Sequence, residues 1–171
     1  MRKMALFGLV GLILLGGCAY YPVKSDVKLL DNIIVKENLV FDVVVDKAKE
    51  VKISEETLSV IRSLISKELK NKNVKTQKNA PLLAKVHITT YKEGNIALRL
   101  LGGTLHGAGR ASIEATILIT QNGIVVLEGI IESKMSKNPF NIGGIYGTER
   151  GVQETFAEEV VKALEKLKVN R

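Results

Sequence analysis

A run of alternating apolar and polar residues that ends in Asn-Gly imposes a β-hairpin on the second half of this 171-residue chain. Apolar side chains recur at every second position from Ala111 to Ile119, and they alternate with the polar or charged residues Arg110, Ser112, Glu114, Thr116 and Thr120. Asn122-Gly123 follows and supplies the positive φ angles of a type I′ turn, after which residues 124–132 can return as the partner strand. We therefore predict two antiparallel strands joined by a two-residue turn.

Apolar residues at helical spacing predict two helices. Ser54 followed by Glu55 and Glu56 is typical of a helix start, because a serine side chain caps the first turn and acids there suit the helix dipole. An apolar stripe follows as far as the turn at residues 71–73, and a second stripe spans residues 152–167. The stripes consist of Leu58, Ile61, Ile65 and Leu69 in the first helix and of Val152, Phe156, Val160, Ala163, Leu164 and Leu167 in the second.

Short segments rich in β-branched and other apolar residues predict further strands within residues 27–35, 39–45 and 82–91. Hairpins in the middle of the chain, without crossover helices between them, disfavour a wholly parallel doubly wound sheet. We predict an α+β fold, a two-layer sandwich in which two helices pack on one face of a sheet. The sheet is expected to be mixed but mostly antiparallel, with about four or five strands.

The N-terminus has the pattern of a secretory signal peptide. A short basic start, Met1-Arg2-Lys3, precedes an apolar run to Leu15 that is too short to cross a bilayer as a stable helix. We predict a signal peptide over residues 1–17, a tether over residues 18–26 and a single domain over residues 27–171. A chain of this length can bury enough surface in one core to need neither disulfide nor metal.

The segment Leu15-Gly16-Gly17-Cys18 resembles the bacterial lipobox, in which the cysteine is acylated, and Cys18 is the only cysteine of the chain. The alternatives are an ordinary signal peptide whose cleavage precedes a cysteine, or a buried core cysteine. The resemblance implies palmitate-type acyl chains on Cys18, which anchor the mature protein to a membrane without spanning it. Ala19 in the next position implies, by the same resemblance, the periplasmic side of the outer membrane in an organism with two membranes.

Two glycine-rich stretches, residues 102–109 and 143–147, interrupt the strand pattern. The first stretch enters a strand and lacks the lysine of a phosphate-binding loop, and neither stretch lies between a strand and a helix as GxGxxG. Nucleotide binding is therefore disfavoured. The alternative is that these glycines allow tight turns and close backbone approach at a sheet edge, including approach to another subunit.

These stretches carry a resemblance to a family. The segment Tyr91 to Arg99, the glycines at 102 and 107–109, the alternating strand and the Asn122-Gly123 turn resemble bacterial lipoproteins catalogued only as a domain of unknown function. The match covers roughly residues 50–165, and it departs from the family pattern at residues 104–106 and 121–123. The resemblance implies an envelope location and no catalytic residues.

The chain offers little for catalysis. His87 and His106 have no further His, Cys or acidic ligand at metal spacing, so we predict no metal and no cofactor. No serine lies in a Gly-x-Ser-x-Gly elbow, and Asp42 and Asp46 share a strand face without further sign of an acid pair. We therefore predict that the protein is not an enzyme.

The long glycine loop offers a weak candidate for anion binding or interaction. Arg99 and Arg110 flank it and, with Lys92, could hold a phosphate or carboxylate. The alternative is that these side chains face solvent or pair with Glu93 and Glu114. The candidate residues are Arg99, Arg110, Gly102, Gly103, Gly107 and Gly109.

Removal of residues 1–17 takes away Arg2 and Lys3, so the formal net charge falls from +7 to 7 − 2 = +5. This positive charge favours anionic lipid head groups, while export from the cytoplasm argues against nucleic acid as the partner. Two functions are consistent with this pattern. The first is a non-enzymatic subunit or adaptor of a cell-envelope assembly, in contact with an envelope protein or with further copies of itself. The alternative is a monomeric periplasmic binding module for an anionic lipid, a glycan or a small ligand.

Overall fold

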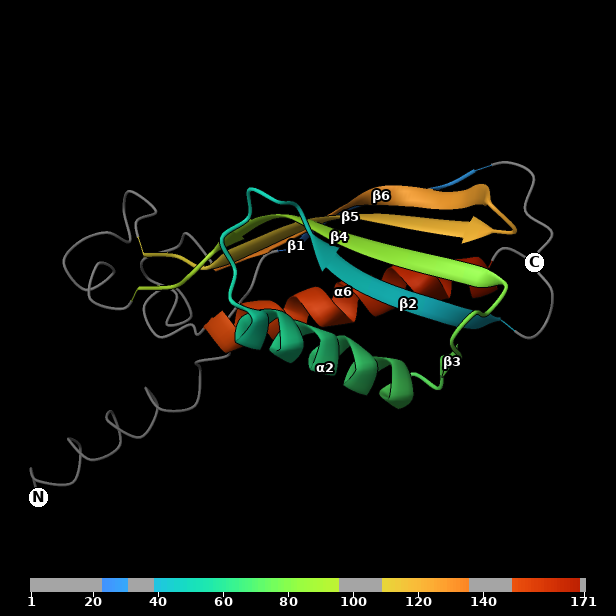
Figure 1. Ribbon diagram of the computed structural model, residues 1–171, viewed down its shortest axis with the longest axis horizontal. Coiled ribbons are helices and arrows are strands. Elements are labelled where there is room, and N and C mark those ends of the chain that lie inside the picture. Colours follow the sequence, from blue (N-terminus) through green and yellow to red (C-terminus); the bar gives the residue numbers. More distant parts are fainter. Residues whose placement is uncertain (1–22, 31–38, 96–108, 136–148, 170–171) are drawn as a thin grey trace, which may run out of the picture.

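The computed structural model describes residues 23–30, 39–95, 109–135 and 149–169 of the chain. In these residues a mixed β-sheet lies against a layer of two helices (Figure 1). The predicted α+β two-layer class is therefore confirmed. The sheet has six strands in the order β1-β6-β5-β4-β2-β3, where four or five were expected.

Antiparallel pairing dominates the sheet. The pairs β1–β6, β6–β5 and β5–β4 are antiparallel, whereas β2 pairs in parallel with both β4 and β3. The elements in chain order are β1 (Val23–Leu29), β2 (Val40–Lys47), α2 (Glu55–Asn71), β3 (Lys75–Thr76), β4 (Leu82–Lys92), β5 (Ser112–Gln121), β6 (Ile124–Lys134) and α6 (Glu149–Val169).

Three features differ from the sequence-based expectation. The additional strand is β3, a two-residue strand without any periodicity, which is formed because the main chain after α2 returns alongside the start of β2. Helix α2 is a crossover between the parallel strands β2 and β4, although no crossover was expected. Strand β1 begins at Val23, inside the segment 18–26 that was predicted to be a tether.

The predicted hairpin is strand β5, a two-residue turn and strand β6. Asn122 and Gly123 have φ angles of 52° and 83°, which are the left-handed angles that a type I′ turn requires. Gln121 pairs with Ile124 directly across the turn. The turn determines the pairing next to it, and an irregularity between Ile119 and Thr120 shifts the register by one residue along the rest of the hairpin.

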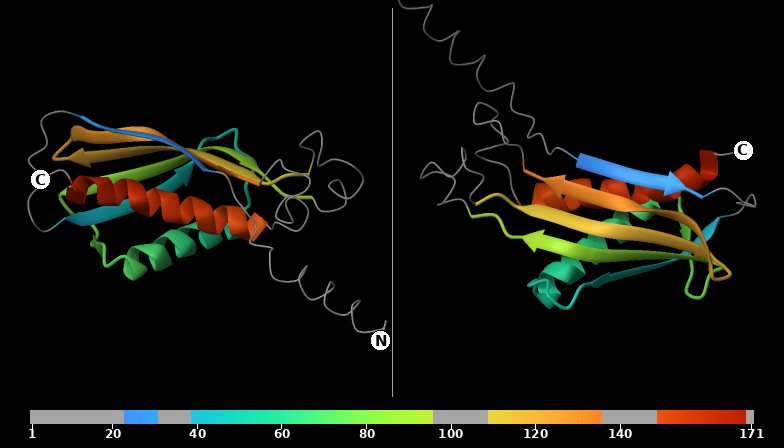
Figure 2. Two further views of the ribbon diagram at one scale, coloured as in Figure 1. Left: turned by 180° about the vertical axis from the view of Figure 1, so that it is seen from behind. Right: turned by 90° about the horizontal axis from the view of Figure 1, so that it is seen from above.

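Both helices cover the same face of the sheet with their predicted apolar stripes (Figure 2). The Ser54 side chain accepts a hydrogen bond of 3.0 Å from the Thr57 N–H and so caps α2 as expected. All predicted stripe residues of both helices are buried, together with Phe41, Val86 and Ile117 from the sheet. No helix in the described ranges is long and apolar enough to cross a membrane.

Strand β1 lies unusually close to β6 at Gly129. A Cβ atom built on Gly129 would lie 2.3 Å from the carbonyl oxygen of Asp26 and 2.6 Å from the Cα atom of Val27. Only glycine fits there without displacing β1. Gly129 therefore determines how closely the first strand of the domain is attached to the sheet.

Candidate functional site

Most residues singled out from the sequence lie outside the described ranges. These residues are Cys18, Arg99, Gly102, Gly103, His106 and Gly107, together with the second glycine stretch at 143–147. The structure therefore does not test the lipid attachment site, and of the arginine patch it describes only Arg110, Gly109 and Lys92. The apolar segment 33–35 predicted as part of a strand also lies outside these ranges.

The described end of the glycine loop is closed by one backbone hydrogen bond. The Gly109 carbonyl accepts a bond of 2.8 Å from the Asn95 N–H, and Gly109 itself has a left-handed φ of 71°. Arg110 follows at the start of β5 and is half-buried, and this burial lowers the pKa of its guanidinium. Because a half-buried arginine also contributes to local packing, its replacement would affect more than surface charge.

A polar cluster joins the end of β4 to the start of α6. The Tyr91 hydroxyl donates a hydrogen bond to the Glu149 carboxylate, and the Gln153 amide donates to both groups at 3.3 Å. Burial, followed by the bond to Glu149, raises the pKa of Tyr91. The raised pKa keeps the Tyr91 hydroxyl a hydrogen-bond donor, and the cluster connects the end of β4 with the start of α6.

A second cluster lies on the sheet face that the helices leave uncovered. The Asp46 carboxylate lies 2.5 Å from His87 Nδ1 and 3.3 Å from Lys85 Nζ, across the parallel pair β2–β4. Burial acts to raise the pKa of Asp46, but the hydrogen bonds and charges of His87 and Lys85 outweigh it and the pKa is lowered. His87 thus has an acidic partner that its sequence neighbours do not reveal. No group of three or more His, Cys, Asp or Glu side chains in the described residues could hold a metal ion.

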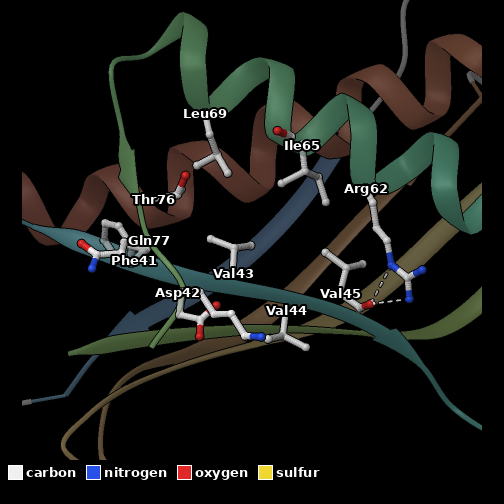
Figure 3. Close-up of a pocket in the computed structure, with 12 residues that line it drawn as sticks. Phe41, Asp42, Val43, Val44, Val45, Arg62, Ile65, Leu69, Thr76 and Gln77 are labelled. Carbon is white, nitrogen blue, oxygen red and sulfur yellow. Dashed lines mark hydrogen bonds between the residues drawn. The ribbon is translucent and has the colours of Figure 1, made fainter. Parts of the chain in front are cut away.

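Sequence reasoning missed a groove between β2 and α2, which we call the β2–α2 groove. Its volume is about 530 Å³, and β2, α2 and the segment after β3 form its walls (Figure 3). The lining residues are Phe41, Asp42, Val43, Val44, Val45, Arg62, Ile65, Ser66, Leu69, Thr76, Gln77 and Lys78. Asp42 is the one acidic residue of this lining, and it accepts a hydrogen bond of 2.9 Å from the Asn79 N–H.

The floor of the groove is an incompletely paired strand edge. The Phe41 carbonyl accepts a hydrogen bond of 2.9 Å from the Gln77 N–H. The Val45 carbonyl accepts two bonds from the Arg62 guanidinium, at 3.0 and 3.2 Å (Figure 3). In a parallel ladder the N–H and the C=O of one residue point to the same side, and the side alternates from each residue to the next. Val43 therefore points both groups to the same edge as Phe41 and Val45. Strand β3 pairs only with Val40 and Phe41, so within the described ranges no strand covers Val43.

Exposed lysines surround one end of the groove. Lys70, Lys72, Lys75 and Lys78 are exposed, and none of them forms an ion pair with another described residue. The sequence contains a signal for this cluster, because Leu69 to Lys92 includes six lysines and no Asp or Glu. The fold adds what the sequence could not show, namely that this run lies next to an open strand edge.

The fold places the chain among two-layer α+β domains, and comparison with known proteins gives matches to solved structures. No protein-family model and no curated protein matches the chain at a significant level. A single-substitution variant of PelC from Paraburkholderia phytofirmans, described as a dodecamer, is 12% identical with a TM-score of 0.51 over 89% of this chain and 100% of that chain. Another PelC dodecamer of that organism is 11% identical with a TM-score of 0.53 over 84% of this chain and 97% of that chain. At these identities the likeness concerns the fold alone.

Proposed function

We propose that this protein is a lipid-anchored, non-enzymatic subunit of a bacterial cell-envelope assembly that contains several copies of the chain. The observation that carries the assembly is the likeness in fold, over nearly the whole of both chains, to structures described as dodecamers. The observation that carries the anchor is the lipobox-like segment ending at Cys18. The outer membrane is the proposed location in an organism with two membranes.

The start of β1 supports a domain held close to the membrane. Val23 is the first residue of the sheet, and only residues 18–22 separate it from the proposed lipid on Cys18. Five residues span at most about 17 Å at roughly 3.5 Å per residue. A folded body on so short a tether has little freedom to leave the membrane surface.

The edges of the sheet support contacts with further chains. β1 is an edge strand, and β2 is an edge strand beyond the two residues that pair with β3. An edge strand presents unpaired backbone N–H and C=O groups to which another chain can add, and β1 stays available to a further copy when β2 binds a different chain. The dodecamers described for the fold neighbours are consistent with contacts between copies.

Acylation is tested by growing cells with an alkyne analogue of palmitate and comparing the wild type with Cys18→Ser. We expect label on the wild type and none on Cys18→Ser, because Cys18 is the only thiol of the chain. Ser25→Ala, an exposed change in β1, serves as the matched control and should keep the label. Equal label on the wild type and on Cys18→Ser would refute the anchor.

Assembly is tested separately. Membranes are solubilised in a mild detergent, the protein is purified through a C-terminal tag, and its mass is measured by native mass spectrometry. A multiple of the protomer mass, or a stoichiometric envelope partner, is the expected result. A monomer without a partner would refute the subunit proposal and favour the alternative, a monomeric module for an anionic lipid, glycan or small ligand.

A further inference from the structure

We infer that the β2–α2 groove binds an extended, acidic segment of a partner protein, which adds to the sheet as a further strand beside β2. This inference concerns a site other than Cys18 and does not depend on acylation. It rests on three observations: an open ladder position at Val43, an apolar wall above it, and unpaired lysines at its end.

The open ladder position determines the backbone conformation of the bound segment. Phe41 and Val45 already use their outward carbonyls, the first with Gln77 and the second with Arg62. Val43, between them, offers both its N–H and its C=O to a chain that runs alongside β2. A strand added beside β2 can form hydrogen bonds with both the N–H and the C=O of Val43.

The walls determine which side chains the segment carries. One face of an added strand would point toward α2, where Ile65 and Leu69 are buried at the groove wall. The other face would point away from the helices, toward solvent. Because successive side chains of a strand alternate between its two faces, the segment should alternate apolar residues with polar ones.

The lysines determine its charge and exclude two other occupants. Lys75 begins β3 and Lys78 lies two residues after its end, in line with a strand added beside Val43, and Lys78 is part of the groove lining. The same edge of a second copy would bring the same lysines against them. The other edge strand, β1, carries Lys24 and Lys28 against a single Asp26 and so is no acidic complement either. Charge complementarity therefore favours a different, acidic chain.

Arg62 has a role of its own in this site. Its guanidinium bonds to the Val45 carbonyl, and its ion pair with Glu55, at 4.0 Å, is long and exposed. A carboxylate of the bound segment could compete with Glu55 for this guanidinium while the bonds to Val45 remain. We expect Arg62 to mark one end of the bound strand and the lysines to mark the other.

The first test selects peptides without assuming a partner. Displayed random peptides of about twelve residues are selected against the full chain in detergent micelles. We expect enrichment of sequences that alternate Asp or Glu with β-branched residues. The affinity of the best peptide is then measured by fluorescence anisotropy, for the wild type and for the double variant that combines Lys75→Glu and Lys78→Glu. Two charge reversals near the surface should weaken binding about tenfold.

A matched control uses the other edge of the sheet. Lys24→Glu with Lys28→Glu reverses two exposed lysines on β1 and changes the net charge by the same amount. We expect it to change the affinity by less than about twofold, because screened charges at that distance contribute little. An equal loss of affinity in both double variants would mean that the peptide responds to net charge alone. That result would refute binding in the β2–α2 groove.

Backbone pairing is tested by N-methylating the selected peptide one residue at a time. In an added strand only alternate N–H groups face β2, so methylation should abolish binding at every second position and have little effect between them. A flat response would show charge attraction by a polyanion-like ligand and would overturn strand addition. The selection could also fail to enrich acidic peptides while the chain associates with itself. If Lys75→Glu with Lys78→Glu abolishes that self-association, a second copy occupies the groove and the inference is wrong.

Discussion

Replacing Gly129 with alanine should detach β1 from the sheet. The new Cβ atom would lie 2.3 Å from the Asp26 carbonyl oxygen, 2.6 Å from Val27 Cα and 2.9 Å from Val27 Cγ2. Close carbon–oxygen contacts between strands are about 3.3–3.6 Å, so β1 would have to move by about 1 Å. The first two contacts are with backbone atoms, which cannot rotate away as a side-chain end could.

The magnitude follows from the size of this overlap. Overpacking of a close-packed site costs about 1–3 kcal/mol, while the loss of glycine freedom in the unfolded chain returns about 0.4–1 kcal/mol. Because the two closest overlaps are with backbone atoms, the cost falls at the upper end of its range, and we expect a net loss of about 2 kcal/mol in the free energy of unfolding. With a urea m-value of about 2 kcal/mol/M, the unfolding midpoint should fall by about 1 M.

Two other glycines provide internal controls. A Cβ at Gly94 would make only ordinary contacts, the nearest at 3.5 Å, so Gly94→Ala should stay within about 0.5 kcal/mol of the wild type. At Gly123 nothing lies within 4 Å, but φ is +83°, so Gly123→Ala should cost about 1 kcal/mol of backbone strain.

The assay is urea unfolding followed by circular dichroism, with hydrogen exchange to locate the change. Gly129→Ala should have the lowest midpoint of the three variants, and the amides of β1 should lose protection before those of β4 and β5. A midpoint for Gly129→Ala equal to or above that of Gly123→Ala would refute the close approach of β1 to β6.

Two polar groups give further predictions. The lowered pKa of Asp46 means that its pairing with His87 and Lys85 stabilises the fold above the usual carboxyl pKa of 3.8 and is lost as the pH falls through the lowered value. Because Asp46 is exposed to more than a third, Asp46→Asn should cost less than about 1 kcal/mol near pH 7, and the urea midpoints of the two proteins should converge as the pH falls below 3.8. Ser133 is buried and donates a 3.1 Å hydrogen bond to the Val152 carbonyl, so Ser133→Ala should cost about 1 kcal/mol by the same assay. An unchanged midpoint would contradict that bond.

Local signals explain why much of the fold was predictable from the sequence. The β5–β6 turn depends on Asn122 and Gly123 alone, and the start of α2 depends on Ser54 and its neighbours. Their partners lie within a few residues along the chain. The alternation in β5 and the apolar stripes of both helices likewise indicate which face of each element is buried, from the residues of that element alone.

Features that depend on topology were not predictable in this way. Strand β3 has two exposed residues, and it is a strand only because β2 lies beside it. The hydrogen bond between Asp46 and His87 joins residues 41 positions apart, and the β2–α2 groove exists because α2 crosses over between two parallel strands. The lysine run was visible in the sequence, but an acid-free run by itself indicates only a solvated surface.

The positions of the two ends of the sheet connect the proposed anchor with the proposed docking site. Val23 pairs with Ser133, Ser133 with Ile113, and Ile113 with Tyr91, so the start of β1 lies at the same end of the sheet as the end of β4 (Figure 2). The lysines lie near the start of β4, and because this strand has eleven residues, the ten steps along it at 3.3 Å each put them about 33 Å away. If Cys18 is acylated, the tether emerges at the Tyr91 end, and the lysines lie at the far end of the sheet. A partner that carries the acidic segment would then be expected to approach from the aqueous side, and anionic lipids of the anchoring membrane would compete weakly with it.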